Sequence, residues 1–480
     1  MEVLQRTANR GSISTGGYEI DNSLKIEADN AERLQRVYSG QSGSISSRTP
    51  TSTKIATFSF WIKRTELQPS GNHLIFLADA NFTWIGFNND NLYILGSTSG
   101  IGLRSTAFFR DTSAWYHIVV AFDTTQSTAS NRVKAYVNGE QVTAWGVQEN
   151  FGTQNNDIDL YDTNTSHYLG WSDAQSQSGY YAEFYLIDGQ QLAPTEFGET
   201  DDDSGIWKPK AYGGTFGNQG YHLDFEDSSD LGKDVSGNGN NFTSHYNGSA
   251  ADQATDTPTN NFCTWNPLVT NAGVFTYTEG ATKWKPSSGN WQTTTASMGF
   301  TKGKWYAEFK MDSNVTAAMV GLQELEKTTN YVGNYLGYST NSTSMGLGYY
   351  NADGKIYKSA GSSSYGASYP SSVLVGVAIE YKDNGVLNLY VAKDNVWQNS
   401  ADPANGTGGF AANSGSAVDG FFSFAASLYQ NPGYWQANFG GYTVNSISSA
   451  ASDANGYGTF EYAPPSGYYA LCTKNLAEYG

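Results

Sequence analysis

"ATFSFWIKR", residues Ala56–Arg64, alternates apolar and polar side chains with a period of two. The even positions Ala56, Phe58, Phe60 and Ile62 are apolar, whereas Thr57, Ser59 and Lys63 are polar. Successive side chains of a strand point to opposite faces of a sheet, so this pattern predicts a strand with one buried face. The same alternation recurs in residues 305–311, 373–381, 422–428 and 435–439.

Turns separate these strands at short intervals. In "VKAYVNGEQVTAW", residues 133–145, Asn138-Gly139 follows three alternating apolar residues. Asn-Gly supplies the two positive φ angles that a two-residue hairpin turn needs. We find no stretch of ten or more residues with a helical period. The sequence therefore predicts an all-β protein built from antiparallel sandwiches.

Composition supports the all-β prediction and narrows the function classes. The 480 residues are 15% charged and 14% aromatic, with 53 glycines and a net charge of −18. Such an acidic chain without a basic run argues against nucleic acid as a partner. The N-terminal residues lack the apolar core of a signal peptide, and no apolar run approaches the length of a membrane span. We expect a soluble protein made in the cytoplasm, with no membrane insertion.

The two cysteines, Cys263 and Cys472, lie far apart in the sequence. Two residues form neither a disulfide framework nor a zinc site. We expect two unpaired thiols, as is usual for a protein made in a reducing compartment.

Polar segments divide the chain. Residues 1–28 are weakly patterned and are interpreted as an N-terminal attachment arm. Strand-like segments fill 29–227 and 262–480, which predicts two domains. Between them, residues 228–261 are rich in Ser, Asp, Asn, Gly and Thr, a composition typical of a linker.

Clusters of aromatic residues in turn-rich segments are candidates for carbohydrate binding, which uses aromatic rings beside amide and hydroxyl groups. The alternative is that these rings fill sandwich cores or subunit contacts. The candidate ligand-binding residues are Trp171, Tyr349, Tyr350, Tyr434 and Trp435.

An Asp- and Asn-rich loop could supply oxygen ligands for calcium. Ordinary turn chemistry explains the same residues and is the preferred reading, so no cofactor is expected and calcium is the alternative. The candidate metal ligands are Asp230, Asp234, Asn238 and Asn240.

Signals for catalysis are absent. No histidine lies in a recognisable Ser/His/Asp motif, and His117 and His222 fall inside predicted strands, where a packed role is expected. Glycoside hydrolysis needs two carboxylates across a cleft, yet no Glu-x-Asp-x-x-Glu pattern is present. We expect no enzyme activity, and a depolymerase acting on surface glycans is the weakest of the alternatives.

Two sets of motifs resemble known families. The first half resembles a concanavalin-A-like, laminin-G-type sandwich of the kind found in structural proteins of marine tailed bacteriophages. Its motifs are "LKIEADNAERLQRVY", "ATFSFWIKRTE", "WYHIVVAFDTT", "VKAYVNGEQV" and "YYAEFYLIDGQQLAPTEFGETDDDSGIWKPK". The second half is similar to a SPRY domain. Its motifs are "GKWYAEFKM", "VGVAIEYKDNGVLNLYVAKDNVWQ", "FFSFAASLYQNPGYWQANFG" and "PPSGYYALCTKNL".

The resemblance implies two concanavalin-like jelly-roll sandwiches in tandem, the second of them SPRY-like. It also implies a phage virion component, assembled in the host cytoplasm, that carries interaction modules. A tail fibre or other appendage that recognises a host-surface receptor or glycan is the leading expectation. The arm would bind other virion proteins, and a homotrimer is expected because fibres are commonly trimeric. A capsid decoration or head-vertex fibre with a purely structural role is the alternative.

Overall fold

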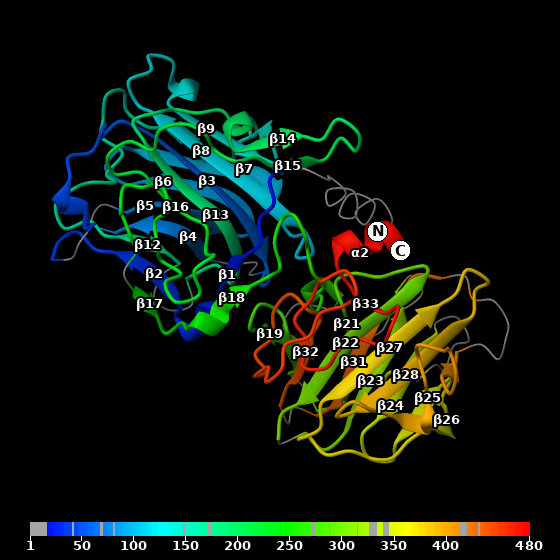
Figure 1. Cartoon of the computed structure of the whole chain (residues 1–480). Helices are drawn as coiled ribbons and strands as arrows, with labels where there is room; N and C mark the ends of the chain where they lie inside the picture. The colour runs from blue at the N-terminus through cyan, green and yellow to red at the C-terminus, as the bar shows by residue number, and fades with distance from the viewer. Residues whose placement is uncertain are drawn as a thin grey trace. The chain divides into compact units, whose positions relative to one another are not determined.

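The alternating segments form two separate pairs of β-sheets in the computed structural model of the chain (Figure 1). The structure describes residues 17–480 except 41–42, 68–70, 80–81, 147–148, 171–174, 243, 270–274, 288, 314, 326–333, 339–344, 413–417, 419 and 431–432. One unit comprises Ser14–Thr259, and the other runs from Asn260 to Gly480. Nearly all ladders between the described strands are antiparallel, which confirms the predicted fold class.

The first unit contains two eight-stranded sheets among its described residues. In spatial order, one sheet contains β10 (Glu140–Gln141), β9 (Val133–Val137), β8 (Trp115–Asp123), β3 (Ile55–Arg64), β13 (Gly179–Asp188), β1 (Ser23–Ile26) and β18 (Gln253–Ala254), with β16 (Tyr221–Leu223) paired to β13. The other contains β11 (Asn150–Phe151), β7 (Ile101–Phe108), β6 (Asn91–Gly96), β5 (Thr83–Asn88), β4 (Asn72–Ala78), β12 (His167–Leu169), β2 (Arg33–Arg36) and β17 (Ser244–Tyr246). A small hairpin pairs β14 (Gly198–Thr200) with β15 (Trp207–Pro209).

The core of the first unit lies between its two large sheets. The even positions of β3 are fully buried there, as the alternation predicts, and Phe58 packs on Phe76 of β4 with ring centroids 4.5 Å apart. The odd positions Thr57, Ser59 and Lys63 are buried as well. They point to the opposite face, where β15 and neighbouring loops contact the sheet. The sandwich is therefore covered on that face too.

The second unit pairs a nine-stranded with a six-stranded sheet. The nine-stranded sheet contains β19 (Phe275–Thr278), β20 (Lys283–Pro286), β32 (Trp435–Asn438), β22 (Gly303–Met311), β27 (Val375–Tyr381), β28 (Leu387–Lys393) and β29 (Val396–Trp397), with β30 (Phe410–Ala411) on β28 and β33 (Tyr469–Ala470) parallel to β22. The six-stranded sheet contains β21 (Trp291–Thr295), β31 (Phe422–Tyr429), β23 (Ala318–Glu324), β24 (Gly346–Tyr350), β25 (Lys355–Lys358) and β26 (Gly361–Ser364).

Large aromatic residues fill the core of the second unit. Trp265, Trp305 and Phe309 are fully buried, and the Trp265 and Phe309 rings lie 5.7 Å apart. Helical structure is short: α2 (Thr473–Tyr479) ends the chain, and the described 3-10 turns are Ala28–Asn30, Ile45–Ser47, Ala129–Asn131, Pro194–Glu196, Ala250–Asp252, Pro267–Val269 and Gln398–Ser400. Both units thus bury a continuous apolar layer between sheets.

The hairpin turn predicted at Asn138-Gly139 is confirmed. It joins β9 to β10, and the two residues have φ angles of 49° and 83°. Both angles are positive, as a type I′ turn requires.

The interpretation of residues 228–261 as a linker is wrong. Within this segment β17 pairs with β2 and β18 pairs with β1, so the polar segment contributes a strand to each sheet of the first unit. The two strands have only three and two residues, which is too short to show alternation, and they lie within a segment of turn-like composition. The first unit therefore continues to Thr259 instead of ending at residue 227.

The boundary predicted for the N-terminal arm is also wrong. Strand β1, inside the predicted arm of residues 1–28, lies between β13 and β18 in the first large sheet. Residues 29–38 contain the end of a 3-10 turn and then β2. Residues 1–16 lie outside the described part of the chain.

Both cysteines are buried, and neither is joined in a disulfide, which agrees with the prediction. Cys263 lies in the core between the sheets, whereas Cys472 lies in a cluster on the outer side of the nine-stranded sheet. Burial raises the pKa of Cys472 to about 12, which keeps its thiol protonated. Within the described residues, no helix combines the length and apolar character needed to cross a membrane.

Candidate functional site

Strand β24 places two of the predicted ligand-binding residues, Tyr349 and Tyr350, on opposite faces of the six-stranded sheet. Tyr349 pairs with Val320 of β23, and both side chains are fully buried in the core. The Tyr349 hydroxyl donates a hydrogen bond of 2.6 Å to the carbonyl oxygen of Ala367. Because neighbouring strand residues point to opposite faces, Tyr350 points outward and is half-buried. The prediction of ligand contact is wrong for Tyr349 and stays open for Tyr350.

Of the other three predicted aromatic residues, Trp435 and Tyr434 pack against neighbouring side chains or backbone, and Trp171 is not among the described residues. Trp435 is fully buried, and its indole N–H donates to the Ser427 carbonyl oxygen, so the prediction of ligand contact is wrong for it. Tyr434 is half-buried, with the ammonium groups of Lys283 and Lys285 over its ring at 4.6 and 4.7 Å from the centroid. Trp171 falls outside the described residues.

An aromatic cluster surrounds Tyr350 on the outer face of the six-stranded sheet. Its rings follow one another at centroid distances of 4.9 to 5.8 Å. Tyr338 and Tyr429 are 39% and 38% exposed, and the other members are half-buried. We define this aromatic cluster as Trp291, Tyr335, Tyr338, Tyr350, Tyr357 and Tyr429.

Residues 334–338 carry two tyrosines of the cluster and pack on the outer face of the six-stranded sheet. The Leu336 amide donates to the Ser427 hydroxyl at 2.8 Å, and the Thr293 hydroxyl donates to the Asn334 carbonyl oxygen at 2.9 Å. A Cβ added to Gly348 would lie 2.7 Å from the Leu336 carbonyl oxygen, so only glycine permits this approach. The small outward residues Thr293, Gly348 and Ser427 therefore leave room for the segment that carries Tyr335 and Tyr338 to pack on the sheet.

Polar groups accompany the rings. The Tyr357 hydroxyl donates to Asp353 at 3.0 Å. Desolvation, and next this hydrogen bond, raise the pKa of Tyr357 to about 12. Desolvation also raises the pKa of Tyr335 and of Tyr350. The hydroxyls therefore stay neutral near pH 7, and the cluster offers apolar ring surface edged by hydrogen-bonding groups.

Most members of this cluster escaped the sequence prediction. Trp291 and Tyr357 lie on strands that contribute few outward aromatics each, and Tyr335 and Tyr338 lie on a segment without a strand pattern. Tyr429 lies five residues before the predicted Tyr434, yet nothing in the sequence pairs it with Trp291, its partner in the ladder. Only the folded register brings them together.

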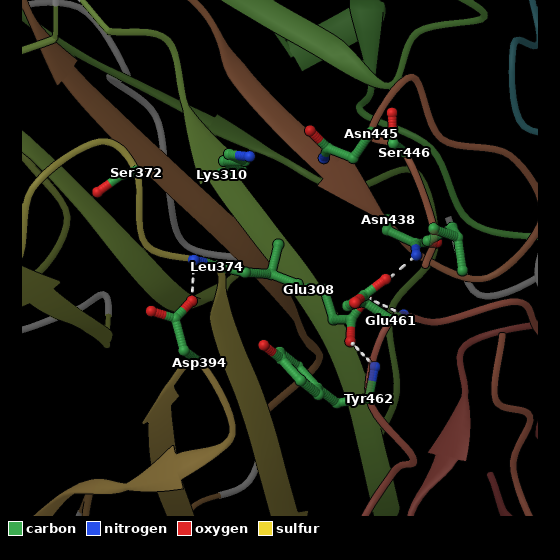
Figure 2. A pocket seen from close by; sticks show the side chains of 11 residues that line it. Glu308, Lys310, Ser372, Leu374, Asp394, Asn438, Asn445, Ser446, Glu461 and Tyr462 are labelled. Carbon is green, nitrogen blue, oxygen red and sulfur yellow. Dashed lines mark hydrogen bonds between the residues drawn. The ribbon is translucent and has the colours of Figure 1, made fainter. Parts of the chain in front are cut away.

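A pocket opens on the outer side of the nine-stranded sheet, with a volume of about 180 Å³ (Figure 2). Glu308 of β22 forms its floor and is almost fully buried. The backbone amides of Glu461 and Tyr462 donate to Glu308 at 2.9 and 2.8 Å. The side chains of Asn438 and Tyr306 also donate to this carboxylate, both at 3.2 Å. Burial raises the pKa of Glu308, while these four hydrogen bonds act in the opposite direction.

The candidate calcium ligands serve the loop that holds them. Asp234 accepts backbone N–H bonds from His222, Ser236 and Asn240 at 2.8 to 3.0 Å. The Asn240 amide oxygen accepts from the buried guanidinium of Arg36 at 2.9 Å. These oxygens already have donors, as in ordinary turn chemistry.

The remaining two candidates give no support to a metal site. The Asn238 amide nitrogen donates to the carbonyl oxygens of Gly217 and Gly220, and Asp230 is exposed on a turn. Across the described ranges, no three His, Cys, Asp or Glu side chains gather in a way that would hold a metal ion.

A buried Ser–His pair in the first unit resembles part of a nucleophilic site. His117 Nε2 lies 2.8 Å from the Ser59 hydroxyl, and the indole N–H of Trp207 donates to His117 Nδ1 at 2.9 Å. Because Nδ1 accepts, the neutral ring carries its proton on Nε2 and donates it to Ser59. Burial lowers the pKa of His117 to about 3. The pair is a packed, satisfied contact and cannot deprotonate the serine.

Comparison with known proteins agrees with the sandwich architecture. Residues 39–191 match the family model described as the concanavalin A-like lectin/glucanases superfamily. No curated protein sequence matches the chain.

Several solved structures match parts of the chain. A human SPRY domain is 14% identical, with a TM-score of 0.26 and coverage of 34% of this chain and 95% of that chain. The PSpry domain of TRIM65 is 12% identical, with a TM-score of 0.25 and coverage of 37% and 88%. A SAP-like pentraxin from Limulus polyphemus is 14% identical, with a TM-score of 0.27 and coverage of 37% and 80%. The chain thus carries a laminin-G-like, concanavalin A-like domain in its first unit, and SPRY domains are among its structural neighbours.

Proposed function

We propose that this chain is a structural protein of a tailed-phage particle that contacts the host surface by binding a glycan at the aromatic cluster. The observation that carries the proposal is the continuous, partly exposed run of rings on the outer face of the six-stranded sheet. The resemblance of the sequence to phage sandwich proteins supports the assignment to a particle.

The chemistry of the cluster suits a sugar chain. The C–H faces of sugar rings pack against aromatic rings, and tyrosine and tryptophan add hydrogen-bonding groups at the ring edge. Tyr and Trp also lose little conformational entropy on binding, since each has only two side-chain torsions. Tyr350 and Trp291 lie at the centre, with ring centroids 5.8 Å apart, and Asp353 provides a carboxylate at one edge.

The described part of the cluster offers aromatic rings, tyrosine hydroxyls and the Asp353 carboxylate as binding groups. The proposal is therefore of a recognition module and not of an enzyme. In the particle, the N-terminal residues ahead of β1 would attach the chain to other virion proteins, and a homotrimer is the proposed assembly.

Two measurements on the particle test this proposal. Antibody labelling of intact virions, viewed by electron microscopy, is expected to place the chain on the tail or on another appendage. Purified chain added before infection is expected to compete with virions for adsorption to host cells. Labelling of the head alone, with no competition, would favour the capsid-decoration role instead. Labelling of no part of the particle would overturn the assignment to a virion.

A further inference from the structure

We propose that the pocket over Glu308 binds one neutral sugar residue, as a free monosaccharide or as the end of a glycan chain. The pocket lies on the nine-stranded sheet, whereas the aromatic cluster lies on the six-stranded sheet, so this second site is independent of the function proposed above. Its lining comes from strands β22 and β32, the segments that flank β27 and β28, and the C-terminal stretch around residues 445–447 and 461–462.

Glu308 fixes the shape of the pocket and is not itself available to a ligand. Both of its carboxylate oxygens accept two hydrogen bonds, from two backbone amides and two side chains. Glu461 is similarly engaged, because the Ser448 amide and hydroxyl both donate to it, and these bonds lower its pKa. The two carboxylates therefore anchor the C-terminal stretch against the sheet and leave recognition to their neighbours.

Hydrogen-bond donors lie along one side of the pocket. The side-chain amide nitrogen of Asn445 is shielded from solvent and has no acceptor among the described residues. A shielded donor without a partner is costly, so an acceptor supplied by a ligand would relieve this cost. In the view of Figure 2, Lys310 and Ser446 lie on the same side as Asn445, where an ammonium and a hydroxyl add further donors.

Acceptors and apolar surface lie on the other side. Asp394 uses one carboxylate oxygen to accept from the Leu374 amide at 2.9 Å, which leaves the second oxygen for a ligand hydroxyl. Tyr462 lies beside it, and the nearby Asp394 charge adds to the desolvation that raises the pKa of this phenol. Leu374 and Ile447 contribute apolar contact.

This combination selects the chemical class of the ligand. Each hydroxyl of a sugar both donates and accepts, so a polyol can satisfy Asn445 and Lys310 on one side and Asp394 on the other. An anion is disfavoured, because three carboxylates and one ammonium line the pocket. A multivalent cation is disfavoured too, because Glu308 and Glu461 already accept bonds from fixed donors. At about 180 Å³ the pocket is smaller than the sites that hold drug-sized ligands, which begin near ~300 Å³.

Titration of the full chain with single sugars tests this inference. The probes are D-glucose, D-galactose, D-mannose and N-acetyl-D-glucosamine, followed by saturation-transfer NMR and calorimetry. We expect at least one to bind saturably with a Kd on the order of millimolar, since small ligands gain little free energy per atom. Asn445→Asp keeps the shape of the side chain but replaces the donor by an acceptor, and Lys310→Met removes the ammonium. Each is expected to weaken binding by about tenfold.

Control variants separate this pocket from other sites. Lys302→Met removes an exposed ammonium just before β22, outside the pocket, and Tyr350→Ala alters the aromatic cluster. Both are expected to leave the monosaccharide affinity unchanged. The inference is overturned if none of the sugars binds saturably, or if either Asn445→Asp or Lys310→Met leaves the affinity as it was. Loss of the affinity in Tyr350→Ala would assign the binding to the aromatic cluster and would overturn it as well.

Discussion

Lys63 and Asp256 lie 193 residues apart in the sequence and form a buried ion pair, with Lys63 Nζ 2.6 Å from Asp256 Oδ2. Both side chains are at most 1% exposed. The other carboxylate oxygen of Asp256 accepts from the indole N–H of Trp115 at 3.1 Å. These contacts join the end of the polar segment 228–261 to the centre of the first large sheet, and they explain why that segment belongs to the sandwich.

We expect Asp256→Asn to lower the free energy of unfolding by about 3–5 kcal/mol, because it removes the buried negative charge that pairs with the buried Lys63 ammonium. Urea unfolding measures this loss. The matched control is Asp157→Asn, which breaks the Lys54–Asp157 pair, whose side chains are 34% and 48% exposed. That change is expected to cost less than about 1 kcal/mol. Equal effects of the two substitutions would contradict the structural role given to Asp256.

The buried His117 makes stability depend on pH. Its pKa of about 3 in the folded chain lies below the ordinary value, so between about pH 6.5 and 3 the unfolded chain binds a proton that the folded chain does not. The free energy of unfolding therefore falls as the pH falls through this window. When the pH falls from 7 to 5, the free energy of unfolding of His117→Gln is expected to fall by about 2 kcal/mol less than that of the unsubstituted chain. Urea unfolding of both proteins at pH 7 and pH 5 measures this difference. An equal fall in the free energy of unfolding in both proteins would contradict the prediction.

Both cysteines are expected to resist alkylation in the folded protein. The thiolate is the reactive form, and burial keeps Cys472 as a thiol with a pKa of about 12. Cys263 is sealed in the core of the second unit. Iodoacetamide at pH 8, followed by mass spectrometry, should label neither residue in buffer and both in urea. Rapid labelling of the native chain would show that the C-terminal stretch opens readily.

Glu308→Gln should weaken the attachment of residues 461–462 to the nine-stranded sheet. The new amide would direct N–H groups at donors that now point to the carboxylate, at a cost of about 2–3 kcal/mol. Glu461→Gln is the control, since Glu461 accepts from the amide and hydroxyl of Ser448 near the protein surface, and we expect a much smaller loss of stability. Thermal or urea unfolding distinguishes the two, and a neutral Glu308→Gln would show that its four hydrogen bonds are not needed.

Alternation predicted the strands well because each large sheet buries one face against its partner. The apolar positions of residues 56–62 and of 305–311 are buried as expected. It could not predict that Lys63 would also be buried, because that depends on Asp256 arriving from a distant segment. Nor could it find β17 and β18, since strands of three and two residues carry no period.

The neighbouring Tyr349 and Tyr350 show how far the sequence alone can predict the residues of the candidate site. Two adjacent tyrosines on a strand must face opposite sides of the sheet, but the sequence does not say which one faces the core. The pairing of Tyr349 with Val320 decides it, because Val320 is a core residue. Likewise, only the folded chain brings Trp291, Tyr350 and Tyr357 together.

Binding of the full chain to the isolated surface polysaccharide of the host tests the central claim most directly. The comparison is between the unsubstituted chain, Tyr350→Ala and Val396→Ala, where Val396 is a 66% exposed apolar residue on the other sheet of the same unit. Loss of an aromatic contact predicts affinity weaker by about tenfold for Tyr350→Ala and unchanged for Val396→Ala. No binding by the unsubstituted chain, or equal affinity for all three proteins, would contradict the account.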